Sequence, residues 1–224
     1  MAQFHFVEDY QNLVKKLMAE MPIDEAMSHA VGGHWEVMGE RCADLLIENG
    51  FKSGMNILDF GCGSGRVALP LSKKITPNGF VGIDIVEELL QYAAGLCPDY
   101  EFVLNHSLKI EVADDMLDGA YAFSVFTHLL QTEILIYKNE IFKKLRSNGI
   151  FIYSFLELNN HWDMFLQSAG AHLAAGRPYP HLNMFLDRNQ IEIMSQKVGF
   201  TVERFIEPSD PSGIGQSVVV LRKP

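Results

Sequence analysis

Three glycines alternate with other residues near position 60, directly after an apolar run that ends in an acid. The segment is Ile57-Leu58-Asp59-Phe60-Gly61-Cys62-Gly63-Ser64-Gly65-Arg66. Glycine lacks a Cβ and adopts positive φ, so this turn lets the backbone approach a ligand closely. A helix that begins after the turn points its amides at an anionic group, whereas Asp59 attracts a cation. The turn therefore predicts a ligand with a carboxylate and an ammonium, an amino-acid moiety.

A dinucleotide is the alternative ligand at this turn. The dinucleotide fingerprint is G-x-G-x-x-G, and here the third glycine, Gly65, falls one position early. Asp59 would also lie near a pyrophosphate and repel it. Both details argue against an NAD-dependent oxidoreductase, which stays open as the less favoured interpretation.

A second acid, Asp84, ends the next apolar run, Val81-Gly82-Ile83-Asp84, nineteen residues after Gly65. An acid at this place accepts hydrogen bonds from both hydroxyls of a ribose. The alternative is that Asp84 only caps the helix that follows. An amino acid joined to a ribonucleoside describes S-adenosylmethionine.

These blocks resemble the class I S-adenosylmethionine-dependent methyltransferases over roughly residues 54–155. The resemblance also rests on Ser124-Val125-Phe126-Thr127-His128-Leu129-Leu130 and on Leu145-Arg146-Ser147-Asn148-Gly149. Gly33-His34-Trp35-Glu36-Val37-Met38-Gly39 is similar to a bacterial subgroup of mostly unassigned substrate.

The resemblance implies a cofactor site for S-adenosylmethionine, with S-adenosylhomocysteine as the product. The turn residues Asp59, Gly61, Cys62, Gly63 and Gly65 would hold the methionine end. Asp84 would bind the ribose and Ile85 one face of the adenine. Asn105 stands where the family usually has an Asp that receives the adenine amino group, and its amide carbonyl still accepts a hydrogen bond. Phe126 would border the reaction chamber.

Methyl transfer is an in-line displacement, so the protein supplies alignment and, for some acceptors, a base. Histidine suits that role near neutral pH, and His128 is the candidate; its alternative role is to order the start of the next helix. His34 and Trp35 lie in a region that this fold often uses as a lid. Trp162, Tyr179 and His181 are further candidates for the substrate pocket.

Short apolar runs alternate with helical patterns from residue 54 onward, which predicts a parallel sheet with crossover helices. The expected strands are Met55–Phe60, Phe80–Ile85, Glu101–Leu104, Ala120–Phe126, Ile150–Phe155, Thr201–Ile206 and Ser217–Leu221. The expected helices are Val7–Met18, Trp35–Asn49, Arg66–Lys74, Glu87–Gly95, Gln131–Leu145 and Arg188–Val198. The fold class is α/β, a three-layer αβα Rossmann-like methyltransferase fold with a mostly parallel seven-stranded sheet whose last strand is antiparallel.

We expect a single domain over residues 1–224, with a helical extension at 1–50 and an insertion at 157–186 that shape the substrate pocket. The insertion is long for a strand-to-helix loop. It is expected to be a lid, partly helical, or a packing hairpin with Trp162, Phe165 and Leu166 in the core.

The chain of 224 residues has 18 Lys+Arg against 28 Asp+Glu, a net charge of −10. This sign disfavours nucleic acid and anionic membranes as partners and indicates tolerance of a neutral or cationic ligand. Three Cys, no leader pattern and no long apolar run predict a cytoplasmic protein with reduced thiols. His29 and His34 are spaced off a shared helical face, so no metal site is expected.

A small-molecule acceptor, methylated on oxygen or nitrogen, is the expected substrate, because the chain is short and acidic. The oligomeric state has no signal in the sequence. A non-catalytic S-adenosylmethionine-binding protein is the remaining alternative, since intact binding residues do not prove turnover.

Overall fold

The computed structural model describes residues 7–176 and 183–224. Its strands are β1 (Asn56–Phe60), β2 (Gly79–Asp84), β3 (Glu101–Leu104), β4 (Leu117–Ala122), β5 (Leu145–Glu157), β6 (Phe185–Leu186), β7 (Thr201–Ile206) and β8 (Ser217–Arg222). Its helices are α1 (Val7–Glu20), α2 (Ile23–Ala30), α3 (Trp35–Glu48), α4 (Ala68–Lys74), α5 (Glu87–Leu96), the 3₁₀ turn η1 (Phe126–His128), α6 (Gln131–Lys144), α7 (Trp162–Ala175) and α8 (Arg188–Val198).

The sheet has the order β3-β2-β1-β4-β5-β8-β7, and β6 adds a short pair at the end of β5. The pairs from β3 through β5 are parallel, whereas β8 runs antiparallel to both β5 and β7. The predicted fold class is confirmed, including the antiparallel last strand. The expected seven strands are joined by β6, whose two residues are too short to give a periodic signal.

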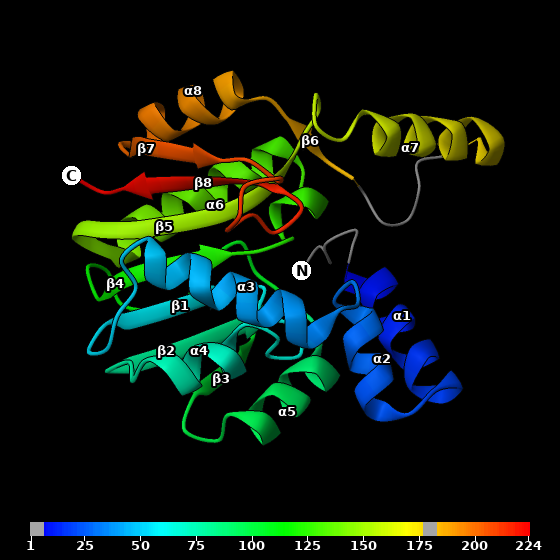
Figure 1. The fold of residues 1–224 in the computed structure, drawn as a ribbon, viewed down its shortest axis with the longest axis horizontal. Coiled ribbons are helices and arrows are strands. Elements are labelled where there is room, and N and C mark those ends of the chain that lie inside the picture. Colours follow the sequence, from blue (N-terminus) through cyan, green and yellow to red (C-terminus); the bar gives the residue numbers. More distant parts are fainter. Residues whose placement is uncertain (1–6, 177–182) are drawn as a thin grey trace.

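Helices cover both faces of the sheet, which gives three layers (Figure 1). Alternate residues of one strand enter different cores: Ile150 and Ile152 of β5 pack with α3 and α4, and Phe151 and Tyr153 pack with α6 and α8. Burial on both faces explains why the central strands are nearly continuous apolar runs.

Between residue 7 and β1 the structure has three helices where two were expected, so that expectation was wrong. Pro22 ends α1, but it is also the N-cap residue of α2; the missing N–H of proline costs little at a helix start, where that group has no intrahelical partner. Val14 of α1 and Met27 of α2 pack on Val86 and Leu89 beside α5. The paired helices α1 and α2 therefore close one end of the sheet.

The insertion contains a helix, α7, and the strand β6, so the expectation that it is partly helical is confirmed. No described residue of α7 is buried, and Trp162 is 51% exposed while it stacks on Phe165 at 5.3 Å between ring centroids. The expectation that Trp162, Phe165 and Leu166 form core is wrong, because α7 projects away from the sheet (Figure 1).

Candidate functional site

A cavity of about 620 Å³ lies at the carboxyl ends of β1, β2 and β4. In parallel sheets this edge collects the loops that bind ligands. The walls come from the glycine turn, α1, the α2–α3 connection, the segment around η1, the foot of α7 and the loop before β8. Elements separated by more than 200 residues therefore meet at one site.

The glycine turn forms the floor of this cavity. Gly61 has φ +76° and Gly63 has φ +55°, and a Cβ at Gly61 would lie 2.3 Å from Cγ2 of Val125. Glycine is thus required at position 61 for two reasons: the backbone has a positive φ, and the side chain of Val125, which follows β4, leaves no room for a Cβ. The amides of Gly61 and Cys62 donate to the carbonyl of Ile83 at 2.8 and 3.0 Å, which locks the ends of β1 and β2 together.

The helix after the turn begins later than expected, at Ala68 instead of Arg66. The amides of Gly61, Cys62 and Gly63 in the turn itself are bonded within the protein, so these three are not free to face an anionic group. Arg66 lines the cavity instead, and its guanidinium donates to the carbonyl of Gly33 at 3.4 Å.

Asp59 is a buried carboxylate at the end of β1. It is 3% exposed, and its Oδ2 accepts a hydrogen bond of 2.8 Å from the hydroxyl of Tyr121. Burial raises the pKa of Asp59 to about 8, against the lowering effects of Tyr121 and Arg66. A cation that enters the cavity would lower this pKa again, because it stabilises the ionised carboxylate.

Asp84 joins the glycine turn to the start of α5. Its Oδ2 accepts from the amide of Gly63 at 2.8 Å, and its Oδ1 accepts from the amides of Ile85 and Val86 at 2.7 and 3.1 Å. Burial raises the pKa of Asp84, which these amides lower. The same side chain lines the cavity with Ile85. Asp84 can therefore both support the start of α5 and contact a ligand in the cavity.

Asn105 lines the cavity beside Asp84, but both ends of its amide already have partners. Oδ1 accepts from the amide and hydroxyl of Ser107 at 2.9 and 3.0 Å, and Nδ2 donates to the carbonyl of Lys109 at 2.9 Å. A hydrogen bond from an adenine amino group to this oxygen would compete with both Ser107 contacts.

Several predicted residues lie outside the cavity. Phe126 is fully buried between Phe60 and Tyr153, so the expectation that it borders the chamber was wrong. The strand predicted as Ala120–Phe126 ends at Ala122, because Ser124 adopts φ 59° and breaks the extended backbone. Val125 lines the cavity in place of Phe126.

Three further predicted site residues, Gly65, Trp35 and Trp162, do not line the cavity. Gly65 packs against Ala93 of α5. Trp35 donates from Nε1 to Ser64 Oγ at 2.9 Å, behind the glycine turn, and Trp162 is on exposed α7. Tyr179 and His181 lie outside the described residues.

His128 and His34 both line the cavity, as predicted pocket residues should, and the ring of His128 meets that of Tyr10 edge-on at 5.7 Å. Other polar lining residues were not among the candidates: Tyr10, His29, Arg66, Ser124, His161 and Gln216. Of these, Arg66 ends the glycine motif, Ser124 opens a block that carries the family resemblance, and His161 lies in the insertion that was expected to shape the substrate pocket.

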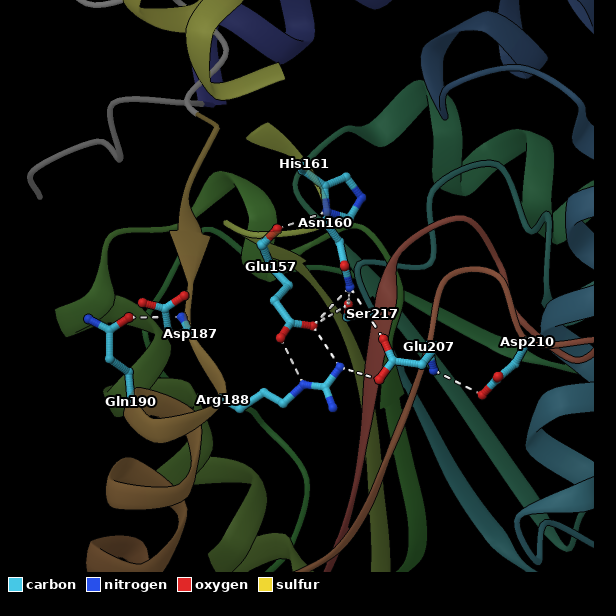
Figure 2. A network of polar contacts seen from close by, with 9 residues as sticks. All are labelled: Glu157, Asn160, His161, Asp187, Arg188, Gln190, Glu207, Asp210 and Ser217. Atoms are coloured by element: carbon cyan, nitrogen blue, oxygen red, sulfur yellow. Dashed lines mark hydrogen bonds and ion pairs between the residues drawn. The ribbon is translucent and has the colours of Figure 1, made fainter. Parts of the chain in front are cut away.

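A polar network fixes the wall of the cavity near α7 and β8 (Figure 2). Arg188 of α8 binds both oxygens of Glu157 at 2.8 and 2.9 Å and also Glu207 at 2.5 Å. Ser217 Oγ donates to Glu157 at 2.7 Å, and His161 Nε2 lies 3.2 Å from the carbonyl oxygen of Gly215. Planar, bidentate pairs of this kind hold a fixed geometry, so the ends of β5, β7 and β8 are tied at one point.

Within residues 7–176 and 183–224, no group of three or more His, Cys, Asp or Glu side chains is arranged to hold a metal ion. In the same ranges, no helix combines the length and the apolar character that a membrane crossing requires.

Comparison with known proteins gives a consistent family. A family model described as "Methyltransferase domain" matches residues 34–204. A demethylmenaquinone methyltransferase of Symbiobacterium thermophilum is 25% identical, with 86% of each chain covered. The methyltransferase phqN of Penicillium fellutanum is 33% identical over 45% of this chain and 32% of its own length. This chain thus spans about a third of the first curated relatives that it matches.

Solved structures share the fold at low identity. Magnesium protoporphyrin IX methyltransferase of Synechocystis, with bound S-adenosylhomocysteine, has a TM-score of 0.67 at 15% identity, covering 98% of this chain and 96% of its own. The [4+2]-cyclase SpnF has a TM-score of 0.61 at 16% identity, covering 83% of this chain and 80% of its own. The fold alone therefore does not determine the reaction.

Proposed function

The chain belongs to the methyltransferase-domain family and uses S-adenosylmethionine as its cofactor, and from this premise we propose that it transfers the methyl group to oxygen or nitrogen of a small molecule. The observation that carries the proposal is the cavity of about 620 Å³, which is lined both by the glycine turn and by four histidines: His29, His34, His128 and His161. This volume lies within the range of small-ligand sites.

The residues around the glycine turn fit the methionine end of the cofactor. An α-amino acid carries an ammonium and a carboxylate, and the cavity offers an acid, Asp59, and a cation, Arg66, that interact electrostatically across it. Asp59 is the partner for the ammonium, because burial alone disfavours its charge and a bound cation restores it. Arg66 is the partner for the carboxylate.

Asp84 and Ile85 fit the nucleoside end. Asp84 Oδ1 already accepts from the amides of Ile85 and Val86, whereas Oδ2 accepts one hydrogen bond, from the amide of Gly63. Oδ2 therefore keeps capacity for a further donor, and a ribose hydroxyl can donate to it. Ile85 offers an apolar surface to the adenine from the same edge of β2.

When bound, S-adenosylmethionine supplies a methyl group whose bond to sulfur breaks, leaving the electron pair on sulfur, as the bond to the acceptor forms and the acceptor proton leaves to a base. In this proposal His128 is that base, because it lines the cavity next to Val125 and the glycine turn. The protein otherwise aligns the reactants and excludes water.

The extension at 1–50 and the insertion at 157–186 would shape the acceptor end of one domain, since Tyr10 and Leu13 of α1 and Met164 of α7 line the cavity. A relative that matches over 86% of this chain, a demethylmenaquinone methyltransferase, favours a small acceptor. Ribosomal protein L11 methyltransferases match over 65% of this chain, so a protein acceptor is the second candidate.

Calorimetry with S-adenosylhomocysteine and with NAD tests the cofactor site. We expect S-adenosylhomocysteine to bind and NAD not to bind; the reverse result would refute the proposal. Turnover is then tested by transfer of labelled methyl from S-adenosylmethionine to a panel of phenols, amines and the L11 protein. Tight cofactor binding with no transfer to any member would favour the non-catalytic alternative.

A further inference from the structure

We propose that the acceptor is a weakly acidic hydroxyl, a phenol or an enol on an apolar body, whose oxygen accepts a hydrogen bond from the side-chain amide of Gln216. This inference rests on the proposed methyl transfer, because it names the acceptor of the same cavity.

Two serines contact the oxygen of the Gln216 side-chain amide. Its Oε1 accepts from Ser154 Oγ at 2.7 Å and from Ser124 Oγ at 3.3 Å. The amide nitrogen of Gln216 contacts neither serine, and it donates to no other group among the described residues. Since Gln216 lines the cavity, this half-buried side chain offers N–H donors to a ligand there.

The backbone on both sides of Gln216 is anchored by the network of Figure 2. The carbonyl of Gly215 faces His161 Nε2 at 3.2 Å, and the hydroxyl of Ser217 donates to Glu157 at 2.7 Å. Glu157 is itself held by Arg188 in a bidentate pair. A donor whose neighbours are already fixed loses little conformational freedom when a ligand binds.

Ser124 carries a further sign of a built site. It adopts φ 59°, a region that costs a non-glycine residue about 1–2 kcal/mol, and its amide donates to Ser154 Oγ at 2.7 Å. The next residue, Val125, touches Gly61 of the cofactor turn. The strained segment thus brings Gln216 next to the place where the methyl group would be presented.

The charges of the lining residues exclude an amine. Among the described residues that line the cavity, the carboxylates are Asp59 and Asp84, both at the glycine turn. The other polar lining residues that could meet an acceptor carry no negative charge: Tyr10, His29, His34, His128, His161 and Gln216. An ammonium that contacts these groups and neither acid would lose its water without gaining a counter-ion, which is costly. A hydroxyl oxygen, in contrast, can accept a hydrogen bond from the side-chain amide of Gln216.

The net charge of −10 indicated tolerance of a neutral or cationic ligand, and a phenol or enol is the neutral case. The body of the acceptor is expected to be apolar, because apolar side chains also line the cavity: Leu13, Met38, Leu129, Leu156, Met164 and Ile214.

Two fragments with one ring system test the acceptor class. The full chain is saturated with S-adenosylhomocysteine and titrated near neutral pH with 2-naphthol or 2-naphthylmethylamine, and binding is followed by calorimetry. We expect naphthol to bind about tenfold tighter, the effect of one well-formed hydrogen bond together with the burial cost of the ammonium. Equal or tighter binding of the amine, or binding of neither fragment, overturns the inference.

Variants of Gln216 then assign the donor. Gln216→Glu keeps an oxygen for both serine hydroxyls but replaces the donor by a second acceptor, so the preference for naphthol should disappear or reverse. Gln216→Met removes donor and acceptor at similar size and should weaken naphthol alone. An unchanged preference in both folded variants refutes the role of Gln216. Affinity for S-adenosylhomocysteine is measured first in each protein; its absence in the wild type would instead refute the proposed methyl transfer.

Discussion

The hydroxyl of Tyr121 on β4 donates a hydrogen bond of 2.8 Å to Oδ2 of Asp59, the buried acid at the end of β1. This contact joins β1 to β4 next to the glycine turn. The hydrogen bond lowers the pKa of Asp59 against the effect of burial. The proton equilibrium of Asp59 is therefore coupled to whatever cation enters the cavity.

Cofactor affinity should rise with pH as Asp59 ionises. Its pKa in the free protein is raised to about 8 by burial, and a bound ammonium lowers it, so binding near neutral pH releases a proton. Below pH 8 the affinity for S-adenosylhomocysteine should increase by up to about tenfold per pH unit. Calorimetry in buffers of different ionisation enthalpy measures this proton release.

Removing the Tyr121 hydroxyl should shift that profile. In Tyr121→Phe the hydrogen bond that lowers the pKa of Asp59 is lost, so the rise in affinity should move to higher pH. Asp59→Asn is the matched control, because it should bind weakly with little dependence on pH. A wild-type profile that is flat from pH 6 to pH 8 would contradict the assignment of Asp59 to the ammonium.

Gly63→Val and Asp84→Ala should each remove cofactor binding without unfolding the domain. The valine would adopt φ +55° with its Cβ 2.7 Å from Val31, and the alanine would release the amide of Gly63. We expect at least about a tenfold loss of affinity from each, measured by calorimetry, with folding checked by circular dichroism. Unchanged affinity in both folded variants would place the cofactor elsewhere.

His128→Ala should lower turnover while cofactor affinity is retained. Loss of a general base typically costs about 10²–10⁴-fold in rate, and the ring lies in the cavity beside Tyr10. Steady-state kinetics with a phenol that is turned over, combined with calorimetry, separate the two effects. Turnover at the wild-type level would leave His128 with a structural role only.

Lys138 should make stability depend on pH. It is fully buried on α6, and its Nζ donates to Ser195 Oγ at 2.7 Å and to Tyr153 Oη at 3.2 Å. Burial lowers its pKa from 10.5 to about 7, so the folded state holds fewer protons than the unfolded state between these values. The destabilising effect is complete below pH 7 and fades as the pH rises toward 10.5.

Denaturant unfolding of the wild type and Lys138→Met measures this effect. The wild type should gain stability relative to the variant as the pH rises from 7 to 9.5, by at most about 1.4 kcal/mol per pH unit. A difference that stays constant over this range would show that Lys138 remains charged in the folded protein.

The cofactor half of the site could be predicted from the sequence, because its parts are local. Glycines at positions that need positive φ and acids at the ends of apolar runs are features of a few consecutive residues, and the rules of parallel sheets bring those ends together. Asp59, Gly61, Gly63 and Asp84 thus line the cavity as the spacing indicated.

Errors occurred where a short-range pattern was ambiguous. The apolar run through Phe126 was expected to continue a strand, but the positive φ of Ser124 ends it and turns Phe126 into the core. Pro22 ended the first helical pattern and concealed α2, which starts immediately after it. Neither backbone choice has a periodic signal.

The part of the cavity that is proposed to bind the acceptor could not be predicted from the sequence, because only the tertiary structure brings its residues together. Gln216 meets Ser124 and Ser154 across 92 and 62 residues. Arg188 ties the ends of β5 and β7, and Ser217 of β8 joins them through Glu157. Propensity and periodicity describe neighbours along the chain, whereas a cavity wall is set by which side chains face each other after the sheet has formed. The sequence by itself thus determined the fold and the ligand of the glycine turn, and the three-dimensional packing decided which groups line the wall that is proposed to receive the acceptor.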